Sequence, residues 1–193
     1  MIIDVSSYQG KIDWDKVKAT PELGGVYIKA SEGVNAPDKD FAARIHEVSA
    51  KGLSFGFYHF ATLNKQDVVS DAISEATYFM QLVHPYKATL PYALDIESNP
   101  AKLPPDKVLL YIKTFFDTLK KAGIEDYCLY SYTPFLNANL PANHDLGPVK
   151  LWLASYTPKY VLPRGWQTAW LWQYTQAGFI NGIKGNVDIS KIV

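Results

Sequence analysis

The chain has 193 residues, 48% of them hydrophobic, so it is long enough for one sizeable core and too short to be assigned two full domains. Nineteen basic and nineteen acidic residues cancel. We therefore expect neither nucleic acid nor an anionic membrane surface as a partner.

Short β-branched or aromatic runs alternate with amphipathic stretches along the chain. The amphipathic stretches predict helices, and the third is the clearest because its apolar residues recur at spacings of three and four. Alternating strands and helices favour a parallel sheet closed into a barrel. The predicted strands span residues 2–6, 25–30, 53–60, 90–96, 127–132, 150–155, 169–174 and 186–189, and the predicted helices span 13–19, 38–51, 67–83 and 105–122.

The last third of the chain departs from this alternation. It contains three predicted strands with no room for full-length helices between them. We therefore expect one α/β domain over residues 1–193, folded as an irregular TIM-like barrel. About five βα units should be followed by a β-rich section that closes the barrel.

The cysteine and the histidines carry little expected chemistry. Cys128 lies in an apolar run and cannot pair within the chain, which predicts a small buried hydrophobe. His59 lies within an aromatic run, so we interpret it as a satisfied core residue, with a general base as the alternative. The other three histidines show no spacing that matches a metal site: His46, His84 and His144.

Carboxyl residues stand at the ends of several predicted strands. In barrels of this kind the reacting groups lie at the C-terminal ends of the strands. Asp4, Asp95 and Asp188 are each set among apolar residues or glycines, where an isolated charge needs a reason. Glu97 follows Asp95 at the spacing that places two side chains on one face of a strand, about 6.5 Å apart. We expect these four carboxyls at one cavity mouth, with structural bonds to backbone N–H groups as the alternative.

The Asp95–Glu97 pair suits the cleavage of a glycosidic bond. Like charges held this close disfavour double ionisation, which raises the pKa of the more buried carboxyl and keeps it protonated near neutral pH. That acid can protonate a leaving oxygen while a carboxylate supports the positive charge developing at the anomeric carbon. Capping of the next helix, or pairing with surface lysines, is the structural alternative.

Taken together, the motifs resemble glycoside hydrolase family 25, the Chalaropsis-type lysozymes. The resemblance runs in order and spacing from residue 3 to about residue 189. It rests on IDVSSYQG at 3–10, IKASEG at 28–33, GFYHF at 56–60, LDIE at 94–97, LWLASY at 151–156, LWQYT at 171–175 and GIKGNVD at 182–188.

The resemblance implies a (β/α)5(β)3 barrel that hydrolyses the β-1,4 bond between N-acetylmuramic acid and N-acetylglucosamine in bacterial peptidoglycan, with no metal or cofactor. It makes Glu97 the general acid and Asp95 the residue that stabilises the reacting N-acetyl sugar, with Asp4 and Asp188 completing the acidic cluster. The expected substrate contacts are Lys29, Glu32, Tyr58, Phe60, Tyr130, Tyr156, Trp172 and Gln173.

Members of the family often carry a C-terminal wall-binding module, which this sequence lacks. We expect either a monomer or a catalytic domain attached to such a module. No export signal opens the sequence, so we expect a protein made in a host cytoplasm and released by lysis, as phage lysins are, or otherwise an extracellular one. In both cases it would act on the bacterial cell wall.

Two other functions compete with this prediction. A chitinase-like hydrolase would read D-x-x-D-x-D-x-E on the fourth strand, but Leu90 and Ala93 occupy the two upstream positions. A catalytically inactive carbohydrate-binding barrel is the second alternative, although it would not need all four carboxyls.

Overall fold

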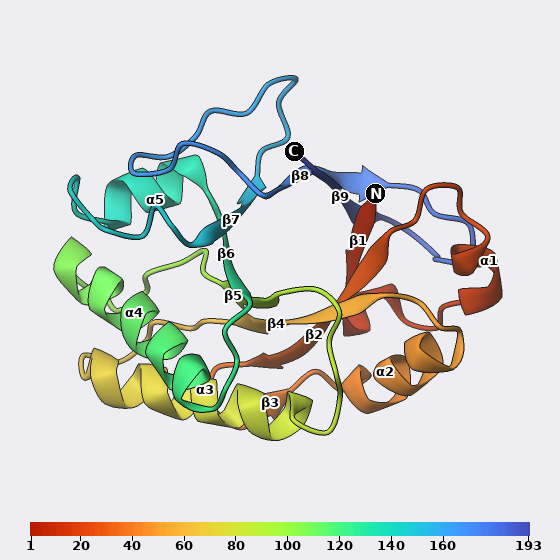
Figure 1. Ribbon diagram of the computed structural model, residues 1–193, viewed down its shortest axis with the longest axis horizontal. Helices are drawn as coiled ribbons and strands as arrows, with labels where there is room; N and C mark the ends of the chain where they lie inside the picture. The colour runs from red at the N-terminus through yellow and green to blue at the C-terminus, as the bar shows by residue number, and fades with distance from the viewer.

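The computed structural model describes residues 1–193 and forms a closed barrel of eight strands, with one short extra strand and five α-helices (Figure 1). The extra strand is β3 (Ala36–Pro37), which pairs only with β2. The barrel is continuous because β1 pairs with β2 on one side and with β9 on the other. In order around the barrel its strands are β1 (Ile2–Val5), β2 (Gly25–Glu32), β4 (Phe55–Phe60), β5 (Tyr92–Asp95), β6 (Tyr127–Tyr132), β7 (Lys150–Ala154), β8 (Leu171–Gly178) and β9 (Val187–Ile192).

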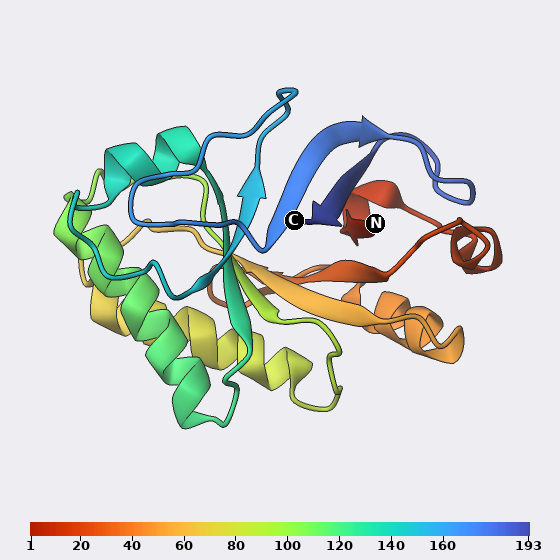
Figure 2. The same ribbon diagram turned by 45° about the horizontal axis from the view of Figure 1, so that its top comes forward.

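The helices cover only part of the barrel. The long helices α3 and α4 lie side by side, whereas no helix covers β8 and β9 (Figures 1 and 2). None of the helices is both long and apolar enough to cross a membrane. The helices are α1 (Trp14–Lys18), α2 (Phe41–Ala50), α3 (Val68–Val83), α4 (Pro105–Lys121) and α5 (Thr133–Asn139), and a 3-10 helix, η1 (Ser7–Gln9), follows β1.

The predicted barrel and its β-rich closing section are confirmed. All eight predicted strands and all four predicted helices form, with ends that shift by a few residues. The sequence patterns missed α5, a seven-residue helix whose two asparagines are weak helix formers. They also ended β8 and β9 too early. The end of β8 continues past the parallel strands and pairs with the beginning of β9, and the last residues of β9 pair with the beginning of β8.

The direction of the last strand differs from the expected parallel arrangement. Strand β9 runs antiparallel to both β1 and β8, whereas the other neighbouring barrel strands are parallel. Asp188 therefore stands at the beginning of its strand and not at the C-terminal end. It still reaches the same rim as the others, directly opposite Asp4 in the β1–β9 register.

Alternation along the strands separates an inner core from the outer core under the helices. The ring of Tyr27 stacks on Trp152 inside the barrel, with 4.3 Å between ring centroids. Cys128 is fully buried beside them, and burial raises its pKa to about 12, so the thiol is an inert core group as predicted. The inner core consists of Ile2, Tyr27, Ala93, Cys128, Tyr130, Trp152, Ala154 and Leu171.

Gly56 on β4 makes room for this inner core. A Cβ atom at Gly56 would lie 2.6 Å from the Tyr27 ring and 2.9 Å from the side chain of Leu90. We expect Gly56→Ala to lower the free energy of unfolding by about 1–3 kcal/mol, the usual range for overpacking a core. Urea denaturation should show this loss, and Gly24→Ala, where the added atom meets only ordinary contacts, should change stability much less. Equal effects of the two variants would contradict the steric argument.

A polar network lies behind β4, on the outside of the barrel wall. His59 is fully buried there, with Nδ1 2.9 Å from Ser31 Oγ and Nε2 2.7 Å from Glu75 Oε2. Glu75 also accepts hydrogen bonds from the hydroxyls of Thr62 and Tyr111, at 2.6 and 2.7 Å. The interpretation of His59 as a satisfied core residue is confirmed, because both ring nitrogens have partners.

Candidate active site

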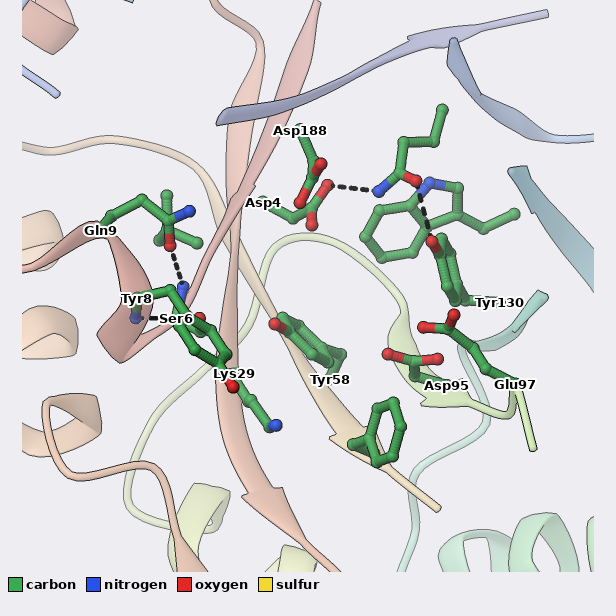
Figure 3. Close-up of a pocket in the computed structure, with 14 residues that line it drawn as sticks. Asp4, Ser6, Tyr8, Gln9, Lys29, Tyr58, Asp95, Glu97, Tyr130 and Asp188 are labelled. Carbon is green, nitrogen blue, oxygen red and sulfur yellow. Dashed lines mark hydrogen bonds between the residues drawn. The ribbon is translucent and has the colours of Figure 1, made fainter. Parts of the chain in front are cut away.

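A pocket opens at the barrel rim, where the C-terminal ends of the parallel strands meet the beginning of β9 (Figure 3). Its cavity volume is about 200 Å³, and the pocket is open to solvent on one side. Its lining residues are Asp4, Val5, Ser6, Tyr8, Gln9, Lys29, Tyr58, Phe60, Asp95, Glu97, Tyr130, Trp152, Gln173 and Asp188.

Asp4 and Asp188 form the first carboxyl pair of the pocket. They face each other across the β1–β9 pairing, and their side chains are in hydrogen-bonding contact (Figure 3). Burial raises the pKa of Asp4 well above its ordinary value, and the charge of Asp188 raises it further. Burial also raises the pKa of Asp188. These two carboxyls therefore share a proton at pH values where exposed carboxyls are ionised.

Asp95 and Glu97 form the second pair, at the end of β5. Between them, Ile96 is fully buried and points into the outer core, so its two neighbours point into the pocket. Two hydrogen bonds hold this segment after the strand ends. Ser131 Oγ donates to the carbonyl of Ile96 at 2.6 Å, and Tyr132 Oη donates to the carbonyl of Glu97 at 2.8 Å.

The two carboxyls of the second pair differ in burial. Asp95 is 6% exposed, and burial, followed by the charge of Glu97 and a hydrogen bond to it, raises the pKa of Asp95 well above the ordinary value. Burial also raises the pKa of Glu97, while its hydrogen bond with Asp95 and the charge of Lys29 oppose the rise. Because burial raises the pKa of Asp95 more than that of Glu97, a proton held by the pair favours Asp95, the more buried carboxyl.

The pocket brings together most of the residues predicted from the sequence. All four predicted carboxyls line it, as do five of the eight expected substrate contacts. Across the described chain, no group of three or more His, Cys, Asp or Glu side chains is arranged to hold a metal ion. The five contacts are Lys29, Tyr58, Phe60, Tyr130 and Gln173.

Three predicted contacts do not line the pocket. Glu32 faces an adjoining hollow and pairs with Lys29 at 2.7 Å. Tyr156 is 48% exposed, and its hydroxyl donates to Gln173 Oε1 at 2.7 Å.

Trp172 is the third, and it packs outside the barrel wall, where its ring lies 4.9 Å from the ring of Tyr160 and beneath the ammonium of Lys191. Strand alternation explains this position, since Leu171 in the inner core and Gln173 in the pocket are the inward residues of β8.

The segment after β1 supplies a wall that sequence reasoning did not assign. Tyr8 lines the pocket although 92% of the residue is exposed. A reciprocal capping box fixes this turn: the N–H of Ser6 donates to Gln9 Oε1 at 2.8 Å, and the N–H of Tyr8 donates to Ser6 Oγ at 3.2 Å. The Ser-x-x-Gln spacing directly after the first strand is the sequence pattern that could have predicted this turn, and with it the position of Tyr8.

A barrel whose rim gathers buried carboxyls that share protons, beside aromatic side chains, defines a hydrolase that uses acid–base chemistry on glycosidic bonds. A family comparison makes the assignment specific. The model of the glycosyl hydrolases family 25 matches residues 3–183, and the chain belongs to this family.

Characterised members of the family resemble the chain over almost its full length. Lysozyme M1 of Streptomyces globisporus is 31% identical, covering 98% of the chain and 66% of that protein. The crystal structure of a bacterial lysozyme from Streptomyces coelicolor superposes with a TM-score of 0.89 at 30% identity, covering 98% of the chain and 90% of that structure.

The modular autolysin LytC from Streptococcus pneumoniae, solved in complex with a synthetic peptidoglycan ligand, gives a TM-score of 0.85 at 29% identity. The superposition covers 98% of the chain and 45% of LytC. The chain thus spans two thirds or less of the length of Lysozyme M1 and of LytC.

Proposed function

We propose that this chain is a muramidase that acts on the bacterial cell wall, where it hydrolyses the β-1,4 bond between N-acetylmuramic acid and N-acetylglucosamine. The observation that carries this proposal is the Asp95–Glu97 pair, two neighbouring carboxyls that line the pocket at the end of β5 and whose pKa values are raised by burial. Membership of the family and the peptidoglycan ligand of LytC support the same substrate.

The Asp95 carboxyl lines the pocket and contacts Glu97 there. Its buried Oδ1 atom accepts no N–H or O–H from another residue, and a buried acceptor short of donors is unfavourable until a ligand supplies one. The N–H of a 2-acetamido group fits this position. Donation from that N–H stabilises ionised Asp95, so the shared proton moves to Glu97, which then protonates the leaving oxygen.

The acetamido oxygen then attacks the anomeric carbon as the bond to the protonated leaving oxygen breaks, with Asp95 holding the group in place. Water, deprotonated by the now ionised Glu97, then attacks the same carbon from the opposite face and opens the oxazoline ring. The ionised carboxyl of the Asp4–Asp188 pair supports the positive charge that develops on the sugar ring. This route retains the anomeric configuration. NMR of the products at early times should therefore show the β-anomer first, and early predominance of the α-anomer would contradict the mechanism without contradicting the hydrolysis.

Digestion of purified peptidoglycan tests which glycosidic bond the protein cleaves. Mass spectrometry of the released fragments should show reducing ends at N-acetylmuramic acid, together with a loss of turbidity in wall suspensions. Chitin oligomers serve as the counter-substrate, because they lack muramic acid. Reducing ends at N-acetylglucosamine, or comparable cleavage of chitin, would contradict the proposal and favour the chitinase-like alternative.

The pH dependence follows from the raised pKa values of the pair. The active form carries one proton, which supplies an acid and a carboxylate together. Because burial raises the pKa of both Asp95 and Glu97, that proton is lost only above the ordinary carboxyl range of about 4. We expect kcat/KM to fall about tenfold per pH unit above the higher apparent pKa of the pair, and to fall again in acid when a second proton binds. Rates that keep rising to about pH 9 would contradict this assignment.

A further inference from the structure

Gln173 sits at the centre of a hydrogen-bond chain in the pocket wall. It points inward from β8 and is 2% exposed. Its Nε2 atom donates to Asp4 Oδ2 at 3.0 Å, and its Oε1 atom accepts from Tyr130 Oη at 2.8 Å and from Tyr156 Oη at 2.7 Å. The bonds to Asp4 and Tyr130 are the dashed lines that converge on one side chain in Figure 3.

These bonds use nearly all of the hydrogen-bonding capacity of the amide. A glutamine side chain has two acceptor sites and two N–H donors. The two tyrosines occupy both acceptor sites, which fixes which way the amide faces, and Asp4 takes one donor. One N–H is left, on a side chain that is almost wholly buried. Gln173 is therefore built to act on Asp4, and it offers the substrate very little.

The bond also restricts where Asp4 can carry a proton. An oxygen that accepts an N–H is a poor site for a proton, and the side chains of Asp4 and Asp188 are in hydrogen-bonding contact. We propose that Gln173 is a positioning residue: it holds Asp4 Oδ2 as an acceptor and so confines the proton shared with Asp188 to the other oxygen of Asp4. The proposal rests on the proposed function, because the ionised oxygen of this pair is the one that supports the charge on the sugar.

The arrangement links an exposed residue at the rim of the pocket to the buried carboxyl of Asp4. Tyr156 is half exposed and Tyr130 is buried, yet both donate to the same oxygen of Gln173. Two donors orient the amide more firmly than one. Removal of the rim donor in Tyr156→Phe should therefore weaken the orientation of Gln173 without abolishing it, with an effect on kcat smaller than that of Gln173→Met.

The test compares two substitutions at position 173. Gln173→Met keeps the length of the side chain and removes every hydrogen bond, so kcat should fall about ten- to a hundredfold at all pH values, with KM within about twofold. Gln173→Glu keeps the shape. Its protonated carboxyl can donate to Asp4 and accept from both tyrosines, whereas the ionised form cannot donate. The kcat of Gln173→Glu should approach the wild-type value in acid and fall away about tenfold per pH unit above the pKa of the new carboxyl.

Gln176→Met is the matched control, because Gln176 lies exposed on the same strand and should leave kcat and its pH profile unchanged. Circular dichroism of each variant checks the fold. A raised KM with unchanged kcat in both variants at position 173 would show a substrate contact and overturn the proposal. A ratio of Gln173→Glu to wild-type kcat that does not change with pH would overturn it as well.

A measurement on the free protein separates this proposal from the proposed function. Carbon-13 NMR of the Asp4 carboxyl follows its titration without any substrate, and Gln173→Met should move that titration to higher pH. If Gln173→Met raises the pH at which Asp4 titrates, but the wild type releases no fragments from peptidoglycan, the positioning role of Gln173 stands and the muramidase assignment fails. An unmoved titration would overturn the positioning role whatever the activity.

Discussion

Glu97→Gln is expected to reduce the hydrolysis of peptidoglycan by about 10²- to 10⁴-fold, the usual contribution of a general acid. The amide has nearly the same shape as the carboxyl but cannot transfer a proton to the leaving oxygen. Since Tyr132 bonds to the backbone carbonyl of Glu97 and not to its side chain, the segment should remain in place. Quantifying the reducing ends released from purified walls checks the result.

The control for this substitution is Glu125→Gln, an exposed carboxyl just before β6 and outside the pocket, which should lyse walls at the wild-type rate. A second substrate sharpens the test. A glycoside whose leaving group departs without a proton makes little use of the acid, so Glu97→Gln should lose far less activity on it. Equal losses on both substrates would mean that Glu97 has a role other than proton donation.

The assignment of the acid needed both the sequence and the structure. The like-charge argument places the proton on the more buried carboxyl, which is Asp95, whereas the family resemblance makes Glu97 the acid. In the mechanism that we propose the two views agree, because the pair acts as one acid whose single proton moves to Glu97 when the substrate donates to Asp95. Burial of each carboxyl decides this point, and a D-x-E motif does not reveal burial.

Strand alternation allowed most of the pocket to be predicted from the sequence. Asp95, Glu97 and Tyr130 lie within or just after apolar parallel strands, whose C-terminal ends must meet at one rim, and the structure places all three there. The same alternation places Trp172 outward, between the inward residues Leu171 and Gln173, whereas the family resemblance implied a substrate contact there. Inward and outward positions therefore predict contacts better than the resemblance alone does.

The direction of β9 and the wall after β1 could not be predicted in the same way. A short strand such as that at 186–189 reads equally well in either direction, and only its pairing with β1 and β8 fixes it as antiparallel. The turn that holds Tyr8 depends on a capping box within four residues, a local signal with no periodicity. Both features come from interactions that hydrophobic patterning does not record.

Glu75→Ala is expected to lower the free energy of unfolding by about 3–5 kcal/mol, because it leaves several buried polar groups without their acceptor at about 1–3 kcal/mol each. Glu75 is fully buried and accepts hydrogen bonds from Thr62 and Tyr111, besides its contact with His59. Its removal leaves those groups without a partner behind the barrel wall. Urea denaturation measures the loss, and Gln81→Ala, at an exposed position of the same helix, should change stability by less than about 0.5 kcal/mol.

The pH dependence of this stabilisation has a definite sign. Burial tends to raise the pKa of Glu75, but its hydrogen bond with His59 and the charge of that ring, with the bonds from Thr62 and Tyr111, outweigh burial and lower the pKa. A lowered pKa means that ionised Glu75 stabilises the fold above the pKa of the unfolded chain, and that this stabilisation is lost as the pH falls through the folded value. The difference in stability between wild type and Glu75→Ala should therefore shrink in acid, and a difference that grew in acid would contradict the assignment.

The effect of Glu75→Ala on activity depends on β4, because this strand contributes residues both to the network around Glu75 and to the pocket. His59 points outward from β4 to Glu75, while its neighbours Tyr58 and Phe60 point into the pocket. Pairing of β4 with β2 and β5 holds all three residues in register independently of Glu75. Glu75→Ala should therefore lose activity in step with the unfolded fraction as temperature rises, and keep most of its kcat where it remains folded. A large loss of kcat in fully folded Glu75→Ala would instead show that the network also holds Tyr58 and Phe60 in their working positions.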